Sequence, residues 1–210
     1  MVDLYFTRHG KTEWNDKGLF QGMYGDSPLL KESYHEIALL GQRLEDGCFT
    51  AIYASSSERA RQTAAAIVQQ LTYQVPIYYD DRLREMSYGK LEGQSIKLMA
   101  KKYGSQLSAM RYHLDRYDPS AFGGETLEAM LKRMTAAVTE AVCSHEGNLL
   151  FVGHGTSMTA TVQFLAGKPF SQLRAMGGMK NNSLNLMEKK PDELHYRLKI
   201  WNDTSFLNKE

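Results

Sequence analysis

The chain has 210 residues, and its 25 Lys and Arg nearly balance 24 Asp and Glu, which leaves a formal net charge of +1. A chain so close to neutral has no overall field that attracts nucleic acid or an anionic membrane, so we expect neither as a partner. The sequence has no apolar run of about 18 residues and no secretory leader pattern, which predicts a cytoplasmic protein without a membrane span.

The two cysteines, Cys48 and Cys143, lie far apart in the sequence and are not part of a C-x-x-C pattern. This usage favours a reducing compartment and two half-buried thiols over a disulfide or a zinc site. A chain of this length can bury roughly 70% of the surface that it exposes when unfolded. We therefore expect a single domain over residues 1–210.

The first half of the chain alternates between predicted strands and helices. Residues 2–7 form a short β-rich run that stops at Gly10, and residues 31–46 have a helical pattern. Residues 50–54 predict another strand, which ends in Ser55-Ser56-Ser57. Serine hydroxyls are common helix N-caps, so a helix should follow with Arg59 in its first turn. Its apolar face would comprise Ala60, Ala64, Ile67, Val68 and Leu71.

The second half begins with a charged helical stretch over residues 95–117, which ends in a loop that reaches Gly124. We interpret residues 95–122 as a helical insertion that covers one face of the molecule. Residues 125–143 predict a further helix, whose continuous apolar stripe indicates core packing. That stripe consists of Leu127, Met130, Leu131, Met134, Ala137, Val138 and Ala141.

The last predicted strands complete the fold class. Residues 148–153 form an apolar run that stops at His154-Gly155, in the same way that the first strand stops at His9-Gly10. Residues 184–187 and 194–200 predict an edge hairpin that turns at Pro191-Asp192. Strands that alternate with helices predict an α/β fold, namely a three-layer α/β/α sandwich with a mostly parallel central sheet and an antiparallel edge hairpin.

The chemistry-bearing residues gather at one edge of this predicted sheet. Ligands of open α/β sheets bind beyond the carboxyl ends of the strands, and His9 and His154 both lie there. Arg59 reaches the same edge if its strand is parallel to the others, and Arg8 precedes His9. The start of the Arg59 helix should add backbone donors for an anion. Two arginines and two histidines in one small space match the oxygens of a phosphoryl group.

The motifs around these residues resemble those of the histidine phosphatase superfamily, in the branch that includes cofactor-dependent phosphoglycerate mutases and small broad-specificity phosphatases. The resemblance covers nearly the whole chain, and six motifs occur in the family's order. They are Arg8-His9-Gly10-x-Thr12-x-x-Asn15, Gln21-Gly22 before Asp26-Ser27-Pro28-Leu29, Ser55-x-x-x-Arg59-Ala60-x-x-Thr63-Ala64, Leu83-Arg84-Glu85-Met86, Gly124-Glu125 and Gly153-His154-Gly155.

The resemblance implies a role for each catalytic residue. His9 would be the nucleophile and would carry the phosphoryl group as a covalent intermediate. Arg8, Arg59 and His154 would hold the equatorial oxygens, where charge accumulates in the transition state. Glu85 would protonate the leaving alkoxide and then accept a proton from water.

The resemblance also implies the remaining contacts of the phosphate site. Asn15, Gln21 and the backbone of Gly22 would complete it, and Gly155 would keep the rim open beside His154. No metal is then required. A zinc site at His9, His154 and Glu85 is disfavoured because the crowded arginines would oppose a cation.

Glu85 and the other histidines also have interpretations that involve no catalysis. Glu85 could instead form an ion pair with Arg82 or Arg84. The other histidines are expected on solvated faces, with His113 as the one that could reach substrate. These are His35, His113, His145 and His195.

Departures from the family bear on the reaction. Leu19 stands where many members carry Arg before the Gln-Gly pair, so a contact to the distal part of the substrate is missing. The second anion clamp of the mutases looks eroded at Gly93-Gln94-Ser95-Ile96 and at Arg111-Tyr112-His113. Basic residues of the insertion could replace this clamp, namely Lys97, Lys101, Lys102 and Arg111.

The expected function is therefore a phosphomonoesterase for small phosphorylated metabolites, working without a cofactor. The first alternative is a phosphoglycerate mutase, which would need 2,3-bisphosphoglycerate. The second alternative is a phospho-ligand binding protein without turnover. The sequence leaves the substrate open, and it is compatible with a monomer or a homodimer.

Overall fold

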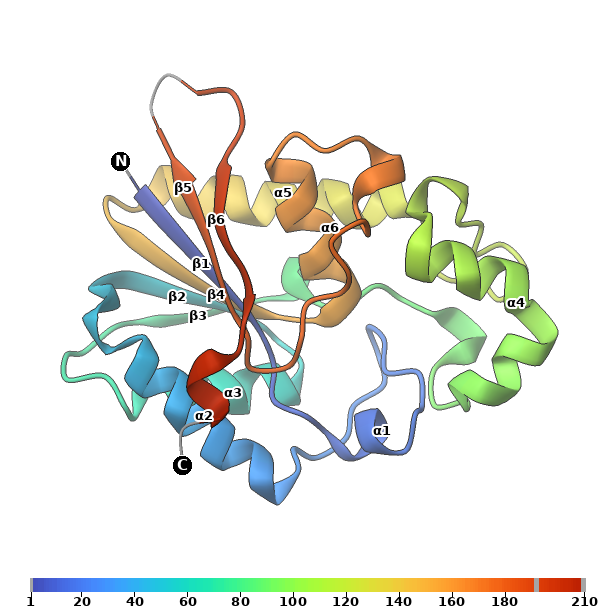
Figure 1. Cartoon of the computed structure of the whole chain (residues 1–210), viewed down its shortest axis with the longest axis horizontal. Coiled ribbons are helices and arrows are strands. Elements are labelled where there is room, and N and C mark those ends of the chain that lie inside the picture. The colour runs from blue at the N-terminus through green and yellow to red at the C-terminus, as the bar shows by residue number, and fades with distance from the viewer. Residues whose placement is uncertain (1, 191–192, 209–210) are drawn as a thin grey trace.

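A mixed sheet of six strands forms the centre of the molecule (Figure 1), and its strand order is β3-β2-β4-β1-β5-β6. The computed structural model describes residues 2–190 and 193–208. The strands are β1 (Val2–Arg8), β2 (Phe49–Ser55), β3 (Ile77–Asp80), β4 (Asn148–Gly153), β5 (Leu184–Lys189) and β6 (Arg197–Asp203).

The pairing of these strands confirms the predicted fold class. β1, β2, β3 and β4 run parallel to one another, whereas β5 is antiparallel to β1 and to β6. The antiparallel pair is the expected edge hairpin. The carboxyl ends of the four parallel strands therefore meet at one edge of the sheet, as the sequence interpretation requires.

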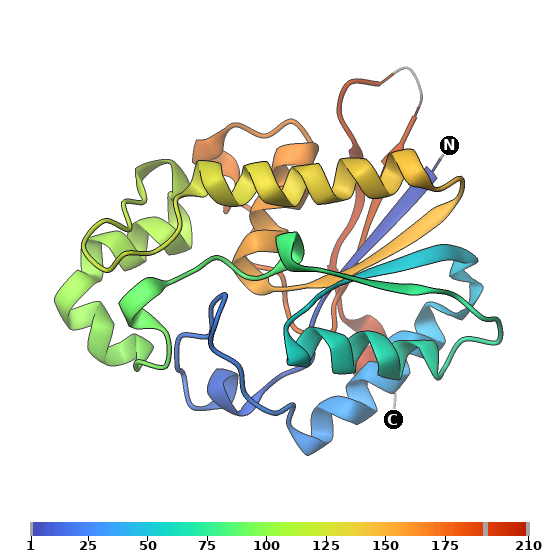
Figure 2. The same ribbon diagram turned by 180° about the vertical axis from the view of Figure 1, so that it is seen from behind.

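Helices cover both faces of the sheet. α2 (Lys31–Arg43) and α3 (Glu58–Val68) lie on one face, and α5 (Leu127–Ser144) and α6 (Gly155–Leu165) lie on the other, as Figures 1 and 2 show from opposite sides. α1 (Glu13–Asp16) and α4 (Ile96–Tyr112) lie beyond the carboxyl ends of the parallel strands. Short 3₁₀ turns cover Glu45–Gly47, Asp81–Leu83, Gly89–Leu91, Leu114–Arg116, Phe170–Gln172 and Ser205–Asn208.

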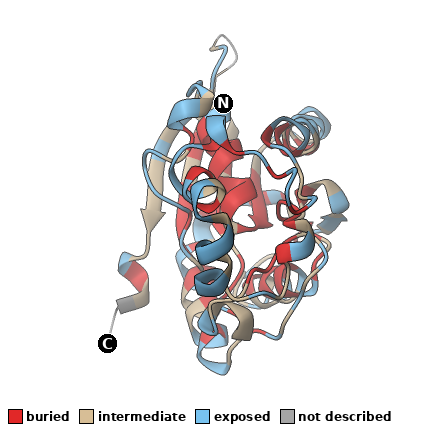
Figure 3. Cartoon of the chain, turned by 90° about the vertical axis from the view of Figure 1, so that its right-hand side faces the viewer, coloured by how far each residue is buried: buried red, intermediate tan, exposed pale blue. Residues whose placement is uncertain are grey.

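Alternation along the strands divides the core into two apolar clusters. Leu4 and Phe6 of β1 belong to the cluster under α5 and α6, whereas Tyr5 between them packs against the cluster under α2 and α3. This is the period of two expected for a sheet that is covered on both faces. Buried residues concentrate in the sheet and on the inner sides of the helices (Figure 3).

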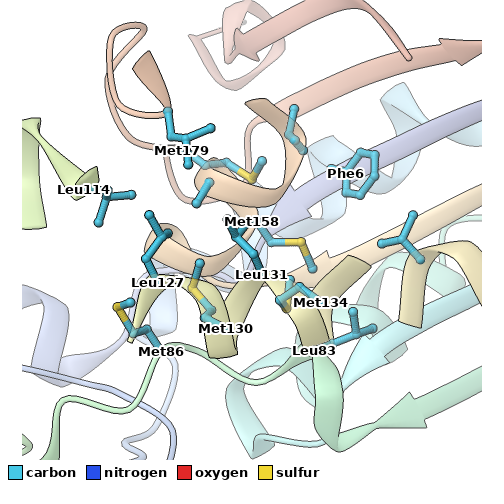
Figure 4. Packing of buried hydrophobic residues seen from close by; sticks show 14 of the residues in the cluster. Phe6, Leu83, Met86, Leu114, Leu127, Met130, Leu131, Met134, Met158 and Met179 are labelled. Atoms are coloured by element: carbon cyan, nitrogen blue, oxygen red, sulfur yellow. The ribbon is translucent and has the colours of Figure 1, made fainter. Parts of the chain in front are cut away.

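The cluster under α5 and α6 is rich in methionine. Figure 4 shows Met86 beside Met130 of α5, with Met134 and Met158 farther along the same cluster. These side chains are all fully buried. Methionine fills irregular gaps because it is unbranched and flexible. Met86 follows Glu85, so this packing anchors the loop that carries Glu85.

Several element boundaries differ from the predictions. α2 ends at Arg43 rather than at residue 46, and α3 ends at Val68, which leaves Leu71 outside the helix. Ser57 is the N-cap of α3 as expected, but its hydroxyl makes no capping bond. β6 begins only at Arg197, and the predicted turn at residues 191–192 lies outside the described residues.

Three elements were not predicted from the sequence, and the predicted burial of the two cysteines was wrong. The missed elements are α1, α6 and the edge strand β3. Cys48 and Cys143 are free and exposed, not half-buried, because each lies at the surface end of an element. Among residues 2–190 and 193–208, no helix has the length and apolar character that crossing a membrane requires.

Candidate active site

The two predicted catalytic histidines meet at the carboxyl ends of neighbouring strands. Arg8 in β1 is paired with Gly153 in β4, and the next backbone N–H, that of His9, donates to the Gly153 carbonyl at 2.9 Å. The ring centroids of His9 and His154 lie 5.2 Å apart. Adjacent parallel strands thus bring together two residues separated by most of the chain.

The hydrogen bonds of His9 define its tautomer. Nδ1 lies 2.7 Å from the Gly10 carbonyl, which can only accept, so Nδ1 carries the proton. Arg59 Nε, which can only donate, points at His9 Nε2 from 3.3 Å. Nε2 is therefore the nitrogen with the free electron pair, and a tautomer of this kind can attack an electrophile through Nε2.

The electrostatics of the site keep both histidines neutral. Burial lowers the pKa of His9 well below its usual value, and the charges of Arg59 and Arg8 lower it further. The pKa of His154 is also lowered well below its usual value, first by burial and then by Arg59. Both rings are essentially inaccessible to solvent. A neutral imidazole keeps the electron pair that a nucleophile requires.

Arg59 is buried in the first turn of α3 and is held by residues 22–26, in the loop between α1 and α2. Its guanidinium donates to the carbonyls of Gly22 (3.0 Å) and Gly25 (2.9 Å) and lies 3.0 Å from the Asp26 carboxylate. The expected free donors at the start of α3 are partly occupied, because the backbone N–H of Glu58 donates to Asp26. The loop thus fixes the direction in which Arg59 faces His9.

His154 is held by Ser55, at the end of β2. The Ser55 hydroxyl lies 2.7 Å from His154 Nε2, and both residues are fully buried. The other ring nitrogen, Nδ1, has no hydrogen-bond partner among the described residues. Ser55 was predicted as a helix cap, and its contact with His154 was not predicted, since nothing in the local pattern relates residue 55 to residue 154.

Glu85 makes no ion pair with Arg82 or Arg84, which excludes the plainer interpretation of this residue. Its carboxylate accepts backbone N–H bonds from Met86 (2.8 Å), Thr156 (2.9 Å) and Ser157 (2.8 Å). The last two belong to the first turn of α6, immediately after His154. The backbone of α6 therefore orients Glu85 toward the site.

Arg82 and Arg84 have other acidic partners. Arg82 pairs with Asp80 and Glu140, at 2.7 Å each, and Arg84 pairs with Asp81 at 3.1 Å. The segment before Glu85 is thus fixed from the surface side by ion pairs that do not involve its carboxylate.

Arg133 is a positioning residue that the sequence analysis did not identify. From α5 it donates to the carbonyls of Arg82, Arg84 and Glu85, and it forms a two-pronged ion pair with Glu125 at 2.7 Å. The Gly124-Glu125 motif is part of the family resemblance, but only the folded chain shows that Arg133 is the partner of Glu125.

A small pocket of about 200 Å³ is lined by four of the seven residues predicted to bind phosphate, namely Arg8, Asn15, Gln21 and Gly155. Glu85 also lines it and is the only acidic residue there within the part of the chain that the structure describes, whereas His9, Gly22, Arg59 and His154 are not among the lining residues. A Cβ on Gly155 would lie 3.2 Å from the Arg8 guanidinium carbon, so glycine leaves room for that group.

Three of the residues that were predicted to bind phosphate also form hydrogen bonds within the protein. The Asn15 side chain accepts from the Thr12 backbone, and the Gln21 side chain accepts from the Thr12 hydroxyl at 2.7 Å. The Gly22 carbonyl accepts from Arg59. Each of these groups is therefore already oriented within the protein.

A second missed residue holds the loop that binds Arg59. The Glu92 carboxylate accepts backbone N–H bonds from Met23, Tyr24 and Gly25, at 3.1, 2.9 and 2.5 Å. It also accepts from Tyr88, so it joins this loop to the segment after Glu85.

None of the remaining four histidines, all in the described part of the chain, lines the small pocket. His35, His113 and His195 are exposed, and His145 is partly buried against Tyr53. Across the described residues, no group of three or more His, Cys, Asp and Glu side chains could hold a metal ion.

The chain is similar to known proteins of one family over most of its length. The model of the histidine phosphatase superfamily (branch 1) matches residues 4–204. Fructose-2,6-bisphosphatase TIGAR of Xenopus laevis is 40% identical over 130 residues, which cover 60% of this chain and 44% of the relative. The chain thus matches less than half the length of that protein.

Two further similarities extend over more of the chain. The 2,3-bisphosphoglycerate-dependent phosphoglycerate mutase of Cytophaga hutchinsonii is 33% identical over 169 residues, which cover 79% of this chain and 78% of the relative. The structure of Bacillus stearothermophilus YhfR superposes with a TM-score of 0.90 at 29% identity, covering 99% of this chain and 100% of that one. The match of the family model to nearly the whole chain, with both histidines inside it, shows that this protein belongs to branch 1 of the histidine phosphatase superfamily.

Proposed function

We propose that this protein is a phosphomonoesterase that hydrolyses small phosphorylated metabolites through a phosphohistidine on His9. The observation that carries this proposal is the state of the His9 ring, which is neutral, protonated on Nδ1 and turned with Nε2 toward Arg59. Arg59 contacts that nitrogen, and His154 and the charge of Arg8 lie near the ring, so groups that suit the oxygens of a phosphoryl group are at hand.

In the first half-reaction, His9 Nε2 attacks phosphorus, and the bond from phosphorus to the ester oxygen breaks. Glu85 gives its proton to the departing oxygen, so an alcohol leaves. In the second half-reaction Glu85 takes a proton from water, the water oxygen bonds to phosphorus, and the nitrogen–phosphorus bond breaks. Inorganic phosphate leaves and His9 recovers its electron pair. Asn15, Gln21, Gly22 and Gly155 bound the phosphate site.

The test is a metal-free assay on p-nitrophenyl phosphate and a panel of alkyl phosphates, with wild type and His9→Ala. We expect phosphate release that His9→Ala abolishes while thermal unfolding remains cooperative. Glu85→Gln should lose more activity on alkyl phosphates than on aryl phosphates, because an aryl oxygen departs without much help from an acid. Equal losses on both classes would remove Glu85 from the acid role.

A phosphoglycerate mutase is the second candidate, favoured by the similarity to the Cytophaga hutchinsonii enzyme over most of both chains. A mutase must hold a bisphosphate intermediate long enough to return its phosphoryl group to another oxygen. Conversion of 3-phosphoglycerate to 2-phosphoglycerate in the presence of 2,3-bisphosphoglycerate, without phosphate release, would establish this reaction instead.

A further inference from the structure

A large cleft continues from the phosphate pocket along the inner side of α4. Its volume is about 1020 Å³, and Arg8 and Arg174 line both the cleft and the smaller pocket that contains Glu85. α4 contributes one wall through residues 96–112, and the segment of residues 174–181 contributes the other. His9 lines neither cavity, but Arg8, the residue before it, lines both, so a ligand with its phosphoryl group between Arg8 and His9 could extend into this cleft.

The lining of the cleft carries charge of only one sign. Arg8, Arg111, Arg174 and Lys180 line it, and no acidic residue among positions 2–190 and 193–208 does. In a chain with a net charge of +1, a concave surface lined by four cations and by no described Asp or Glu is a local feature. A surface of this kind attracts anionic ligands.

Two cations of this group, Arg8 and Arg174, have a buried donor without a hydrogen-bond partner among the described residues, and Arg174 is the one that the proposed phosphate site does not use. Its Nε donates to the backbone carbonyl of Arg111 at 3.1 Å, which fixes the plane of the guanidinium. Its Nη1 is buried and has no hydrogen-bond partner among the described residues, and no ion pair there involves Arg174. A buried donor without a partner is costly, and an anionic ligand in the cleft would remove that cost.

The surroundings of Arg174 place it on the leaving-group side of the reaction. Burial lowers the pKa of Arg174, and the nearby Tyr88 and Glu85 oppose that shift. Glu85 is the group that would protonate the leaving oxygen, so Arg174 lies close to the part of the substrate that departs. Leu19 lines the same small pocket, and the sequence analysis found no arginine there.

We propose that Arg174, supported by Arg111 and Lys180, forms a second anion subsite that binds a carboxylate or a second phosphate on the leaving group of the substrate. This inference rests on the proposed function in one respect, since it takes the reacting phosphoryl group to lie at His9. It narrows the substrate class to phosphomonoesters with a second negative charge.

Binding to a variant without turnover tests the subsite separately from catalysis. In the His9→Ala background, isothermal titration would compare 3-phosphoglycerate with glycerol 3-phosphate, which differ by a carboxylate. It would also compare fructose 1,6-bisphosphate with fructose 6-phosphate, which differ by a second phosphate. We expect the more anionic member of at least one pair to bind about tenfold more tightly, and the responsive pair identifies the anion.

Arg174→Gln should abolish that preference, and Arg174→Lys should keep part of it because the charge remains without the fork. The control is Arg116→Gln, which removes the same charge from an exposed side chain that does not line the cleft. If Arg174→Gln fails to fold, Arg174→Lys carries the comparison.

The outcomes separate this inference from the proposed function. Absence of a preference in both pairs, a preference that survives Arg174→Gln, or an equal loss in Arg116→Gln would overturn the subsite. These results hold whether or not wild type hydrolyses any ester. The absence of His9-dependent phosphate release from p-nitrophenyl phosphate, with an Arg174-dependent binding preference, would overturn only the phosphatase function.

Discussion

Replacement of Arg133 by alanine should destabilise the protein and misplace Glu85. The side chains of Arg133 and Glu125 are only 16% and 12% exposed, so the pair is largely removed from water. Arg133→Ala leaves the Glu125 carboxylate without its charged partner, with only a long bond from the Ser87 backbone, and removes a donor from three carbonyls. Breaking a buried ion pair by removing one partner costs about 3–5 kcal/mol, and the residual exposure here favours the lower end, about 3 kcal/mol.

Urea unfolding of four proteins would measure this loss: wild type, Arg133→Ala, Glu125→Gln and the double variant. We expect the double variant to be less destabilised than the sum of the single ones, because it leaves no unpaired charge behind. A loss below about 1 kcal/mol for Arg133→Ala, or strict additivity, would refute the argument that this ion pair holds the Glu85 segment.

Kinetics should report the same change. Arg133→Lys keeps the charge but cannot reach both Glu125 and the carbonyls of residues 82–85, so Glu85 loses its orientation. Its activity should fall more on alkyl than on aryl phosphates, as in Glu85→Gln. A uniform fall on both classes would mean that Arg133 supports the fold alone. The control is Arg116→Gln, which should match wild type on both.

Three further predictions concern the groups around His9 and His154. The pKa of both rings is lower in the folded than in the unfolded chain, so the unfolded chain binds more protons in acid. The free energy of unfolding should therefore fall by about 1.4 kcal/mol per histidine for each pH unit below about 6.5. A free energy of unfolding that does not change between pH 7 and pH 5 would contradict this. Ser55→Ala should cost about 1–3 kcal/mol in thermal unfolding, because it leaves a buried His154 nitrogen without its partner, and an unchanged Tm would show that this bond contributes nothing. Glu92→Gln should raise KM for phosphomonoesters more than it lowers kcat, since it loosens the loop that holds Arg59; an unchanged KM would exclude that role.

The sequence indicated the strand-end histidines because their signal is local. His9 and His154 each follow an apolar run and precede glycine, and parallel strands bring such positions to one edge. The roles of Ser55, Arg133 and Arg174 were missed because their partners are distant in the chain. No periodicity relates residue 133 to residue 85, and only the folded sheet and α5 bring them into contact.

The missed elements also have physical reasons. β3 is a short edge strand whose Tyr78 and Tyr79 are 45% and 42% exposed, so it lacks the apolar run of a central strand. α6 is buried around most of its circumference, from Thr156 to Gln163, and a helix of that kind shows no single apolar stripe.

The main-chain bond between His9 and Gly153 has a consequence for how this fold can diversify. It ties the spacing of the two histidines to the pairing of β1 with β4, so a one-residue insertion in either strand would turn one ring to the opposite face of the sheet. Residues 96–112 take no part in that pairing, although they form a wall of the cleft. Exchange or lengthening of this segment can therefore alter which molecules enter the cleft while the phosphoryl-binding edge stays intact. Substrate specificity can thus change in evolution without a change in the catalytic residues.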